Sequence, residues 1–361
     1  MNYSFIIVLV IIKDVTLSKI LSYTLLRSFG TYDFFLTIGG SIKQVELDMT
    51  NQYLCVYDYK HLDNDTFNSN VTLPIYNENI NFSLSYTTIE VGHEVVVNVF
   101  PVFTFQNTSL MKFDSFPLAH HYFNTSHSII HSLYNKKYIE NRSFGLYFNL
   151  LSGYLFFGGI PKEFIDEFHY SHQFKVMSKD QLSWTIDIKK VQFNGTTIKI
   201  NNNVMLQSNI KYIKAPESFL YQLADTVFKD YIKTNACIFH KETLTKYFQC
   251  SCEEIINFPN FKFTLGDIEI EFKSNEMFFN NDFVCPFMIE SSSIYQNQWV
   301  FGLTFLQRYV SYFDIDNDMI TLYSKTEFKI VSNDKLKYFI GLNIFINLIS
   351  FIILLYMKFK L

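Results

Sequence analysis

Short strand-like runs separated by polar turn residues cover most of this chain and restrict it to a β-rich fold. In each run, β-branched and aromatic residues alternate with polar ones or form a short apolar block. The runs expected to be strands are residues 34–38, 44–47, 82–86, 94–100, 145–148, 154–157, 184–191, 196–200, 261–265, 268–272, 299–303, 309–314 and 319–323. Helix patterns are few, and the best are 128–138 and 217–231, the second opening with Pro216. The pattern predicts a large all-β sandwich or barrel-like architecture, which two similar halves could form.

Length and charge narrow the functional classes. With 361 residues, the chain is long enough for two domains of ordinary size. Hydrophobic residues make up 48% and charged residues 18% of the sequence, which favours a globular protein over a disordered one. The formal net charge is −4 and no Lys/Arg run is present, so nucleic acid is not an expected partner.

The N-terminal segment has the character of a secretory signal. Residues 5–12 form an apolar block that Lys13 and Asp14 follow, too short to cross a bilayer but suited to the apolar core of a signal peptide. Thr16 and Ser18 are small residues at the positions that a signal peptidase reads, which predicts a signal peptide at 1–18. A buried N-terminal strand is the alternative interpretation.

A second apolar segment lies near the C-terminus. Residues 338–357 carry no charge and, as a helix rising 1.5 Å per residue, would cross the roughly 30 Å hydrocarbon core of a bilayer. A transmembrane helix is therefore expected there, after a juxtamembrane stalk at 329–337 and before a cytoplasmic tail at 358–361. A GPI signal is the competing interpretation, but Lys358 and Lys360 after the apolar block are typical of a stop-transfer end.

Together the two segments predict a single-pass type I membrane protein whose ectodomain is extracellular or lies in the secretory or endosomal lumen. Sequons for N-glycosylation support a secretory route, although an Asn-rich chain contains some by chance. The sequons begin at Asn64, Asn70, Asn81, Asn107, Asn124, Asn141 and Asn194.

Five cysteines in an oxidising compartment suggest two disulfides and one remaining thiol. Spacing alone suggests that Cys252 pairs with Cys285 and that Cys237 pairs with Cys250. This connectivity would leave Cys55 unpaired.

One stretch near the end of the predicted ectodomain is the most specific motif in the chain. Residues 299–322 begin Trp-Val-Phe-Gly and continue through Phe313-Asp314 and a turn to a final apolar strand ending at Leu322. This stretch resembles the C-terminal signature of pepsin-like aspartic proteases.

Other landmarks follow in the family's order. Residues 154–160, Tyr-Leu-Phe-Phe-Gly-Gly-Ile, resemble the hydrophobic strand and Gly-Gly turn of the family's first lobe, and Ser183-Trp184 resembles the entry to the second. The cysteines at 252 and 285 lie on either side of Pro259, where the family places a second-lobe disulfide.

The resemblance spans roughly residues 32–323 and implies a bilobal pepsin-like fold. Its lobes are expected at 28–175 and 176–328.

The family uses one Asp from a turn in each lobe, and the two carboxyls activate a water as base and acid. Residues 47–56, Leu-Asp-Met-Thr-Asn-Gln-Tyr-Leu-Cys-Val, resemble the first turn and place its catalytic residue at Asp48. Met49 and Thr50 stand where the family has Thr and Gly, so a bracing hydroxyl is lost and a position of backbone freedom is filled.

The second turn lacks a carboxylate. Ile213-Lys-Ala-Pro216 resembles the segment that follows the family's second Asp, and counting back nine residues from Pro216 gives Gln207. No Asp or Glu occurs between Asp187 and Glu217, so shifting the alignment does not recover an acid. A Gln amide can hydrogen-bond Asp48 but cannot ionise or act as an acid.

Two further groups of residues have a possible functional interpretation. Residues 82–88, Phe-Ser-Leu-Ser-Tyr-Thr-Thr, resemble the strand of the family's flap, with Tyr86 covering a cleft and Thr87 and Thr88 as the turn. Four histidines could be considered as metal ligands, but no HExxH motif accompanies them, and a structural or solvated role without metal is expected. They are His120, His121, His127 and His131.

The sequence thus predicts a membrane-anchored pepsin-like homologue without cofactors that is catalytically inactive and binds a peptide or protein in a retained cleft. The alternative is an active aspartic endopeptidase in which Asp48 acts with a second acid that the sequence does not place. A different hydrolase class has no supporting motif.

Overall fold

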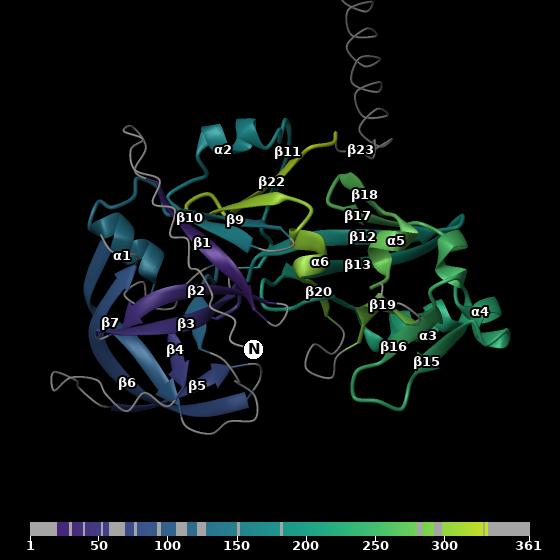
Figure 1. The fold of residues 1–361 in the computed structure, drawn as a ribbon, viewed down its shortest axis with the longest axis horizontal. Coiled ribbons are helices and arrows are strands. Elements are labelled where there is room, and N and C mark those ends of the chain that lie inside the picture. Colours follow the sequence, from purple (N-terminus) through teal and green to yellow (C-terminus); the bar gives the residue numbers. More distant parts are fainter. Residues whose placement is uncertain are drawn as a thin grey trace, which may run out of the picture.

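The computed structural model describes residues 20–28, 31–38, 40–51, 53–57, 69–75, 78–91, 95–105, 114–120, 128–149, 152–180, 183–279, 284–291, 298–327 and 329–330. Within these residues the protein is mainly β, as the sequence predicts, and its strands form two sheets (Figure 1). The predicted signal peptide at 1–18 and the predicted transmembrane segment at 338–357 lie outside the described residues. Among the described residues, no helix is both long and apolar enough to cross a membrane.

The first sheet contains most of the N-terminal half. Its strands, in spatial order, are β11 (His172–Met177), β22 (Met319–Ser324), β21 (Val310–Asp314), β9 (Ser143–Phe148), β10 (Ser152–Phe157), β1 (Leu21–Ser28), β2 (Thr31–Ile38), β3 (Ser41–Asp48), β8 (Ser115–Pro117), β4 (Cys55–Tyr57), β7 (Val95–Phe105), β6 (Glu78–Val91) and β5 (Ser69–Ile75). Strand β1 precedes the start predicted for the first lobe and pairs with both β2 and β10.

The second sheet is formed mainly by residues 185–301. Its strands, in spatial order, are β15 (Cys237–His240), β16 (Tyr247–Ser251), β19 (Val284–Glu290), β14 (Ile213–Lys214), β20 (Trp299–Phe301), β13 (Thr196–Leu206), β12 (Thr185–Phe193), β17 (Phe261–Leu265), β18 (Ile268–Phe272) and β23 (Lys329–Ile330). Asn194 and Gly195, both at positive φ, form the tight turn that joins β12 to β13.

Helices are short and lie around the sheets (Figure 1). They are α1 (Ile129–Asn135), α2 (Lys162–Glu167), α3 (Glu217–Asp225), α4 (Lys229–Lys233), the 3-10 helix η2 (Glu254–Asn257), α5 (Ser274–Met277) and α6 (Leu303–Leu306). The single helix predicted at 217–231 is therefore interrupted. Phe228 is fully buried between α3 and α4 and stacks on Phe248 at 3.9 Å, so core packing overrides the helical pattern at this point.

The two sheets repeat one pairing pattern at their centres. In the first, β3 runs parallel to β8, β4 runs parallel to β7, and β4 pairs antiparallel with β8. In the second, β13 runs parallel to β20, β14 runs parallel to β19, and β14 pairs antiparallel with β20. This repeat supports the interpretation that the chain contains two similar halves. The C-terminal ends of β3 and β13 occupy equivalent positions in the two halves.

The first sheet contains strands from both ends of the chain. Strands β21 and β22 belong to the C-terminal part of the chain but pair with β9 and β11 of the first sheet. One continuous hydrophobic core extends from Leu25 to Leu322. Trp184, fully buried, donates from its indole Nε1 to the Leu118 carbonyl at 3.0 Å and thereby connects the segment entering the second sheet to the first sheet.

Candidate functional site

The ends of β3 and β13 meet in the interior and bring Asp48 next to Gln207. The Asp48 side chain is 2% exposed and the Gln207 side chain is completely buried. Gln207 Nε2 lies 3.1 Å from Asp48 Oδ1 and 3.1 Å from Thr50 Oγ1. The residues that the sequence places at the two catalytic positions of a pepsin-like site are thus in direct contact.

Asp48 Oδ1 is the acceptor of a dense set of hydrogen bonds. Within its own turn it accepts from the Thr50 backbone N–H at 2.9 Å, from the Thr50 hydroxyl at 2.8 Å and from the Asn51 N–H at 3.1 Å. Gln207 adds a fourth donor. A carboxylate oxygen has about two lone-pair sites, so these donors leave Oδ1 no free site for an attacking water.

The strand ends hold the two residues at this separation. The Leu118 N–H donates to the Asp48 carbonyl at 2.8 Å, while the Gln207 N–H donates to the Phe301 carbonyl at 3.1 Å. Asn51 connects the first turn to β8, because its Nδ2 donates to Ser115 Oγ at 2.9 Å. Both turns are therefore fixed by the crossing strands of their own sheet.

The Gln207 amide has a defined orientation. Turning it over would place Oε1 against Asp48 Oδ1, two acceptors facing each other, so Nε2 must be the atom that faces the carboxylate. Gln207 Oε1 is then buried and has no hydrogen-bond partner among the described residues. Burying an unpaired acceptor costs about 1–3 kcal/mol, so this amide is held in place at the expense of some stability.

Comparison with known proteins identifies the family of the chain. The sequence model of the eukaryotic aspartyl protease family matches residues 103–325, more than half of the chain. The chain belongs to the eukaryotic aspartyl protease family. A mouse protein, Renin-2, is 24% identical over 196 residues, which cover 50% of this chain and 45% of Renin-2, so the chain matches less than half of that relative's length.

The family match includes Gln207 but begins after Asp48. The assignment of Asp48 to the first turn of this aspartyl protease fold therefore rests on its local sequence and on its contact with Gln207 across the two sheets.

Departures from the family pattern in the first turn have structural consequences. Met49 is fully buried in the hydrophobic core and offers no hydroxyl. Thr50 occupies the family's Gly position without adopting a positive φ, and its hydroxyl instead donates to Asp48. A threonine can therefore take the place of glycine at this position without backbone strain.

Ser208 braces the two turns and was not foreseen from the sequence. It follows Gln207 as Met49 follows Asp48, and its buried hydroxyl donates to the Leu47 carbonyl at 2.6 Å. One hydroxyl brace between the halves is therefore present, and it comes from the second turn. A Ser directly after the Gln207 position was the available signal.

Glu46 is a second residue that the sequence analysis missed. It lies two positions before Asp48 on β3, and side chains two apart on a strand point to the same face. It pairs in register with Asp33 of β2, and its Oε1 accepts from the Thr31 hydroxyl at 3.1 Å. Burial, together with the charges of Asp33 and Asp48, raises the pKa of Glu46 to about 7 even though the Thr31 bond opposes this shift.

Tyr86 lies on β6, in the antiparallel ladder that this strand forms with β7. Strand β6 continues through Thr87 and Thr88 to Val91, and Tyr86 pairs with Pro101 of β7 in the middle of this ladder. The turn expected at Thr87 and Thr88 is therefore wrong, because cross-strand pairing with β7 keeps this segment extended. A covering role for Tyr86, which is half-buried, stays a prediction.

Two of the four histidines considered as metal ligands, His120 and His131, lie in the described part of the chain and are buried. His120 is buried, with Nδ1 2.7 Å from the Asp180 carbonyl and Nε2 3.0 Å from Asp318 Oδ1. His131 Nε2 accepts from Arg142 Nη1 at 3.0 Å. His121 and His127 lie outside the described residues. Within the described residues, no group of three or more His, Cys, Asp or Glu is arranged to hold a metal ion.

Both disulfides suggested by spacing are present, Cys237–Cys250 and Cys252–Cys285. Cys55 is a buried free thiol, and burial raises its pKa to about 12. Of the predicted glycosylation sites, Asn141 and Asn194 are exposed, while Asn70 and Asn81 lie in β5 and β6. The sequons at Asn64, Asn107 and Asn124 fall outside the described residues.

Proposed function

We propose that this aspartyl protease family member binds an extended peptide or protein segment without hydrolysing it, and that residues 338–357 attach it to a membrane as a type I protein. The observation that carries the proposal is the hydrogen bond from Gln207 Nε2 to Asp48 Oδ1 at 3.1 Å. An amide occupies the place where peptide hydrolysis by this family requires the second carboxyl.

Two features of the site support the absence of hydrolysis. Gln207 can donate and accept hydrogen bonds but cannot ionise at ordinary pH, so the site lacks one of the two groups that act as acid and base. The four donors around Asp48 Oδ1 also occupy the lone-pair sites of that oxygen.

A binding role is supported by what the same site retains. The two β-rich halves and their crossing strands are preserved around Asp48 and Gln207, and Thr50 and Glu46 next to them are partly exposed. An extended ligand between two β-rich halves would bind through backbone hydrogen bonds and side-chain pockets. The two disulfides support a secretory or extracellular location for this ectodomain.

The decisive experiment is hydrolysis of a broad quenched-fluorescence peptide library between pH 3 and 6 by the full-length protein in detergent. No cleavage is expected, whereas pools containing a ligand should raise the unfolding temperature of the protein. Asp48→Ala should abolish that rise, and Asp267→Ala, a change at an exposed carboxylate, should not. Cleavage that disappears only in Asp48→Ala would overturn the proposal, and so would a failure of every pool to stabilise the folded protein.

Glu46 favours a second candidate function, an aspartic endopeptidase in which it supplies the missing acid. With its pKa raised to about 7, Glu46 is a protonated carboxylic acid in the pH range where this chemistry operates. In this candidate Asp48 is the base and Glu46 the proton donor. Cleavage that is lost in both Asp48→Ala and Glu46→Gln would establish it, and cleavage unaffected by Glu46→Gln would exclude it.

A further inference from the structure

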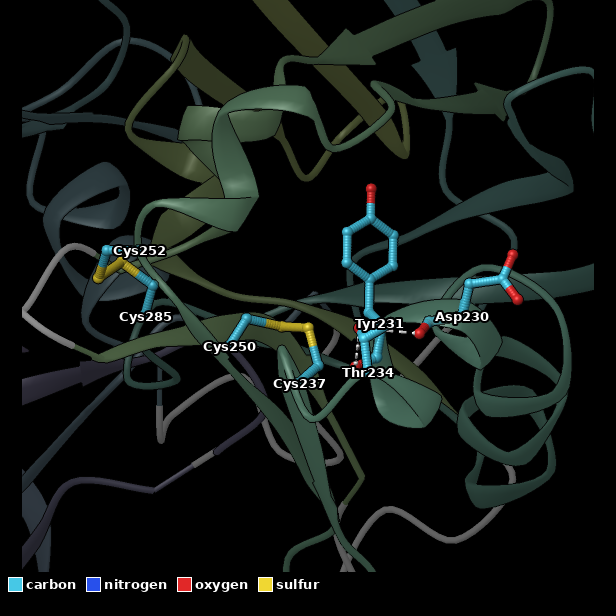
Figure 2. The surroundings of a disulfide bond; sticks show 7 residues. All are labelled: Asp230, Tyr231, Thr234, Cys237, Cys250, Cys252 and Cys285. Atoms are coloured by element: carbon cyan, nitrogen blue, oxygen red, sulfur yellow. Dashed lines mark hydrogen bonds between the residues drawn. A yellow bond between two sulfur atoms is a disulfide. The ribbon is translucent and has the colours of Figure 1, made fainter.

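Three cysteines form a row across the edge of the second sheet. Strands β15, β16 and β19 are neighbours in that order, with β15 at the edge. Cys237 pairs in register with Cys250, and Cys250 pairs in register with Cys285. Cys250 therefore has a cysteine directly opposite it on both sides, although it is bonded only to Cys237, and Cys285 is bonded instead to Cys252. Figure 2 shows the two disulfides side by side, with Cys250 and Cys285 as the inner pair.

This register permits a second disulfide pattern. Directly opposite residues of antiparallel strands have Cα atoms about 4.5–5.5 Å apart, inside the range of about 4.4–6.8 Å that disulfides require. Their side chains also point to the same face of the sheet. The register therefore places Cys250 and Cys285 as neighbours between which a disulfide can form.

The row also has the geometry for exchange. A thiolate attacks one sulfur of a disulfide from the side opposite the sulfur that leaves. Cys285 lies on one side of Cys250, on β19, and Cys237 lies on the other side, on β15. A thiolate at Cys285 would approach Cys250 with Cys237 as the leaving group.

The exposure of the cysteines decides which of them an external thiol can reach. Cys237, Cys250 and Cys285 are all buried, with at most 2% of each residue exposed, whereas Cys252 is partly exposed. An external thiol can therefore reach Cys252 first. The next two residues, Glu253 and Glu254, are exposed and would repel an anionic thiol, so a neutral or cationic thiol is favoured at this position.

We propose that Cys252 is a thiol-exchange site and that exchange there shifts the internal disulfide from Cys237–Cys250 to Cys250–Cys285. The external thiolate forms a mixed disulfide with Cys252 Sγ, which breaks the Cys252–Cys285 bond and releases Cys285 as a thiolate. Cys285 Sγ then bonds to Cys250 Sγ, the Cys237–Cys250 bond breaks, and Cys237 leaves as a thiolate that takes up a proton. One external thiol is bound at Cys252, one protein thiol is freed at Cys237 and the number of disulfides is unchanged, so no oxidant or reductant is consumed.

The shift would release the edge of the sheet. In the observed pattern, the Cys237–Cys250 bond ties β15 covalently to β16. After exchange, β15 would be held by its backbone ladder and by side-chain packing such as that of Phe239 on Phe248 at 4.5 Å. Lys241, which is exposed and follows β15 directly, should then become a more frequent site of tryptic cleavage in the folded protein.

The test uses the full-length protein in a buffer of cysteamine and cystamine, followed by an acid quench, unfolding in N-ethylmaleimide and tryptic mapping. Trypsin places Cys237, Cys250 and Cys285 on three different peptides, 234–241, 247–262 and 274–308. In the wild type we expect a cysteamine adduct on peptide 247–262, a maleimide label on Cys237 and a crosslink between peptides 247–262 and 274–308. An adduct without label on Cys237 would overturn the shift, and the absence of any adduct would overturn the entry site.

Two variants complete the test. In Cys252→Ser, Cys285 has lost its partner and can exchange with Cys250 directly. At least about one molecule in ten should then carry its label on Cys237, which is the fraction expected if the Cys237–Cys250 form is favoured tenfold over the Cys250–Cys285 form. Label confined to Cys285 would overturn the proposal. In Cys285→Ser the relay is broken and Cys237 should stay unlabelled. Label on Cys237 in that variant would show that the reagent opens Cys237–Cys250 directly, which also overturns it.

Discussion

At the scale of single residues, the contact between Gln207 and Asp48 determines both the chemistry and the stability of the site. The buried amide donates to a buried carboxylate that four donors surround. This donor gives the carboxylate a hydrogen bond without introducing a second charge. A carboxylate at the same position would have the opposite effect.

Gln207→Glu should therefore destabilise the protein in a pH-dependent way. At pH 7 two carboxylates about 3 Å apart cannot both ionise without strong repulsion, and we expect a loss of about 2–4 kcal/mol in the free energy of unfolding. At pH 4 a shared proton removes most of this repulsion, so the loss should be smaller. Urea unfolding at both pH values measures it, and Gln207→Met, which removes the donor without adding charge, is the control. An equal loss at both pH values in Gln207→Glu would contradict this account.

The raised pKa of Glu46 leads to a second prediction, about how the stability of the protein depends on pH. The pKa of Glu46 is raised from the ordinary value of 4.5 to about 7 in the folded protein, so the folded state binds its proton more tightly than the unfolded chain. This contribution to stability is complete below pH 4.5 and is lost as the pH rises through 7. Because the side chain is only half-buried, we expect a total change of about 1–3 kcal/mol.

Glu46→Gln should remove this pH dependence. Wild-type stability should fall between pH 5 and pH 7.5 by more than that of the variant, as measured by urea unfolding in the same buffers. Glu163→Gln, a change at an exposed glutamate, should leave the wild-type slope unaltered. Equal slopes in the wild type and in Glu46→Gln would show that Glu46 does not retain its proton in the folded state.

The residue scale also shows what the sequence could reveal about the site. Asp48 and Gln207 were placed by resemblance, and the structure brings them together. Ser208 and Glu46 were missed because their importance depends on a partner across the fold, Leu47 in one case and Asp33 in the other. Only the spacing of Glu46 and Asp48 on one strand face was visible in advance.

At the scale of elements, the segment around Gly302 shows why a small residue is required between β20 and α6. A Cβ at this position would clash with the Ile210 carbonyl and would lie 2.6 Å from the Tyr212 carbonyl. Both neighbours are backbone atoms and cannot move away as a side chain could. The Leu303 N–H donates to the same Ile210 carbonyl at 2.7 Å, which keeps the two segments close.

Gly302→Ala should therefore cost about 2–4 kcal/mol of stability through overpacking against the backbone. Gly195→Ala is the matched control, because Gly195 has open space around it and only its φ of +76° opposes a side chain. That change should cost about 1 kcal/mol. Thermal unfolding of both variants measures the difference. A Gly302→Ala protein as stable as Gly195→Ala would mean that the 210–212 segment can move.

Sequence patterns located hairpin strands with a clear alternating pattern better than very short strands that form only by pairing with distant parts of the chain. The strands predicted at 261–265 and 268–272 coincide with β17 and β18, because a two-residue turn at Gly266 and Asp267 joins two clear alternating runs. Strands β8 and β14 have three and two residues, and no run that short carries a periodic signal. They form because neighbouring strands at the centre of each sheet pair with them.

At the scale of the whole molecule, the all-β class and the family were predictable, but the pairing of the last strands with the first sheet was not. Periodicity does not reveal which strands pair across long sequence distances. Strand β21 follows the second sheet in the chain, yet it pairs with β9, and Phe313 on it stacks on Phe144 at 4.7 Å. The first half of the chain therefore depends on its last strands for part of its sheet and core.

This dependence predicts that the N-terminal half does not fold alone. A fragment of residues 20–180 lacks β21 and β22, so the edges of β9 and β11 and the face of Phe144 are exposed to water. It should be largely unfolded by circular dichroism and rapidly digested by trypsin.

Appending residues 308–327 through a flexible Gly/Ser linker should restore β21 and β22 and with them protease resistance, because the paired edges and the Phe144–Phe313 stack return. A scrambled 308–327 segment is the control for added mass. If residues 20–180 resisted trypsin as well as the extended fragment does, the shared sheet would not be what holds the two halves together, and the first lobe would fold independently.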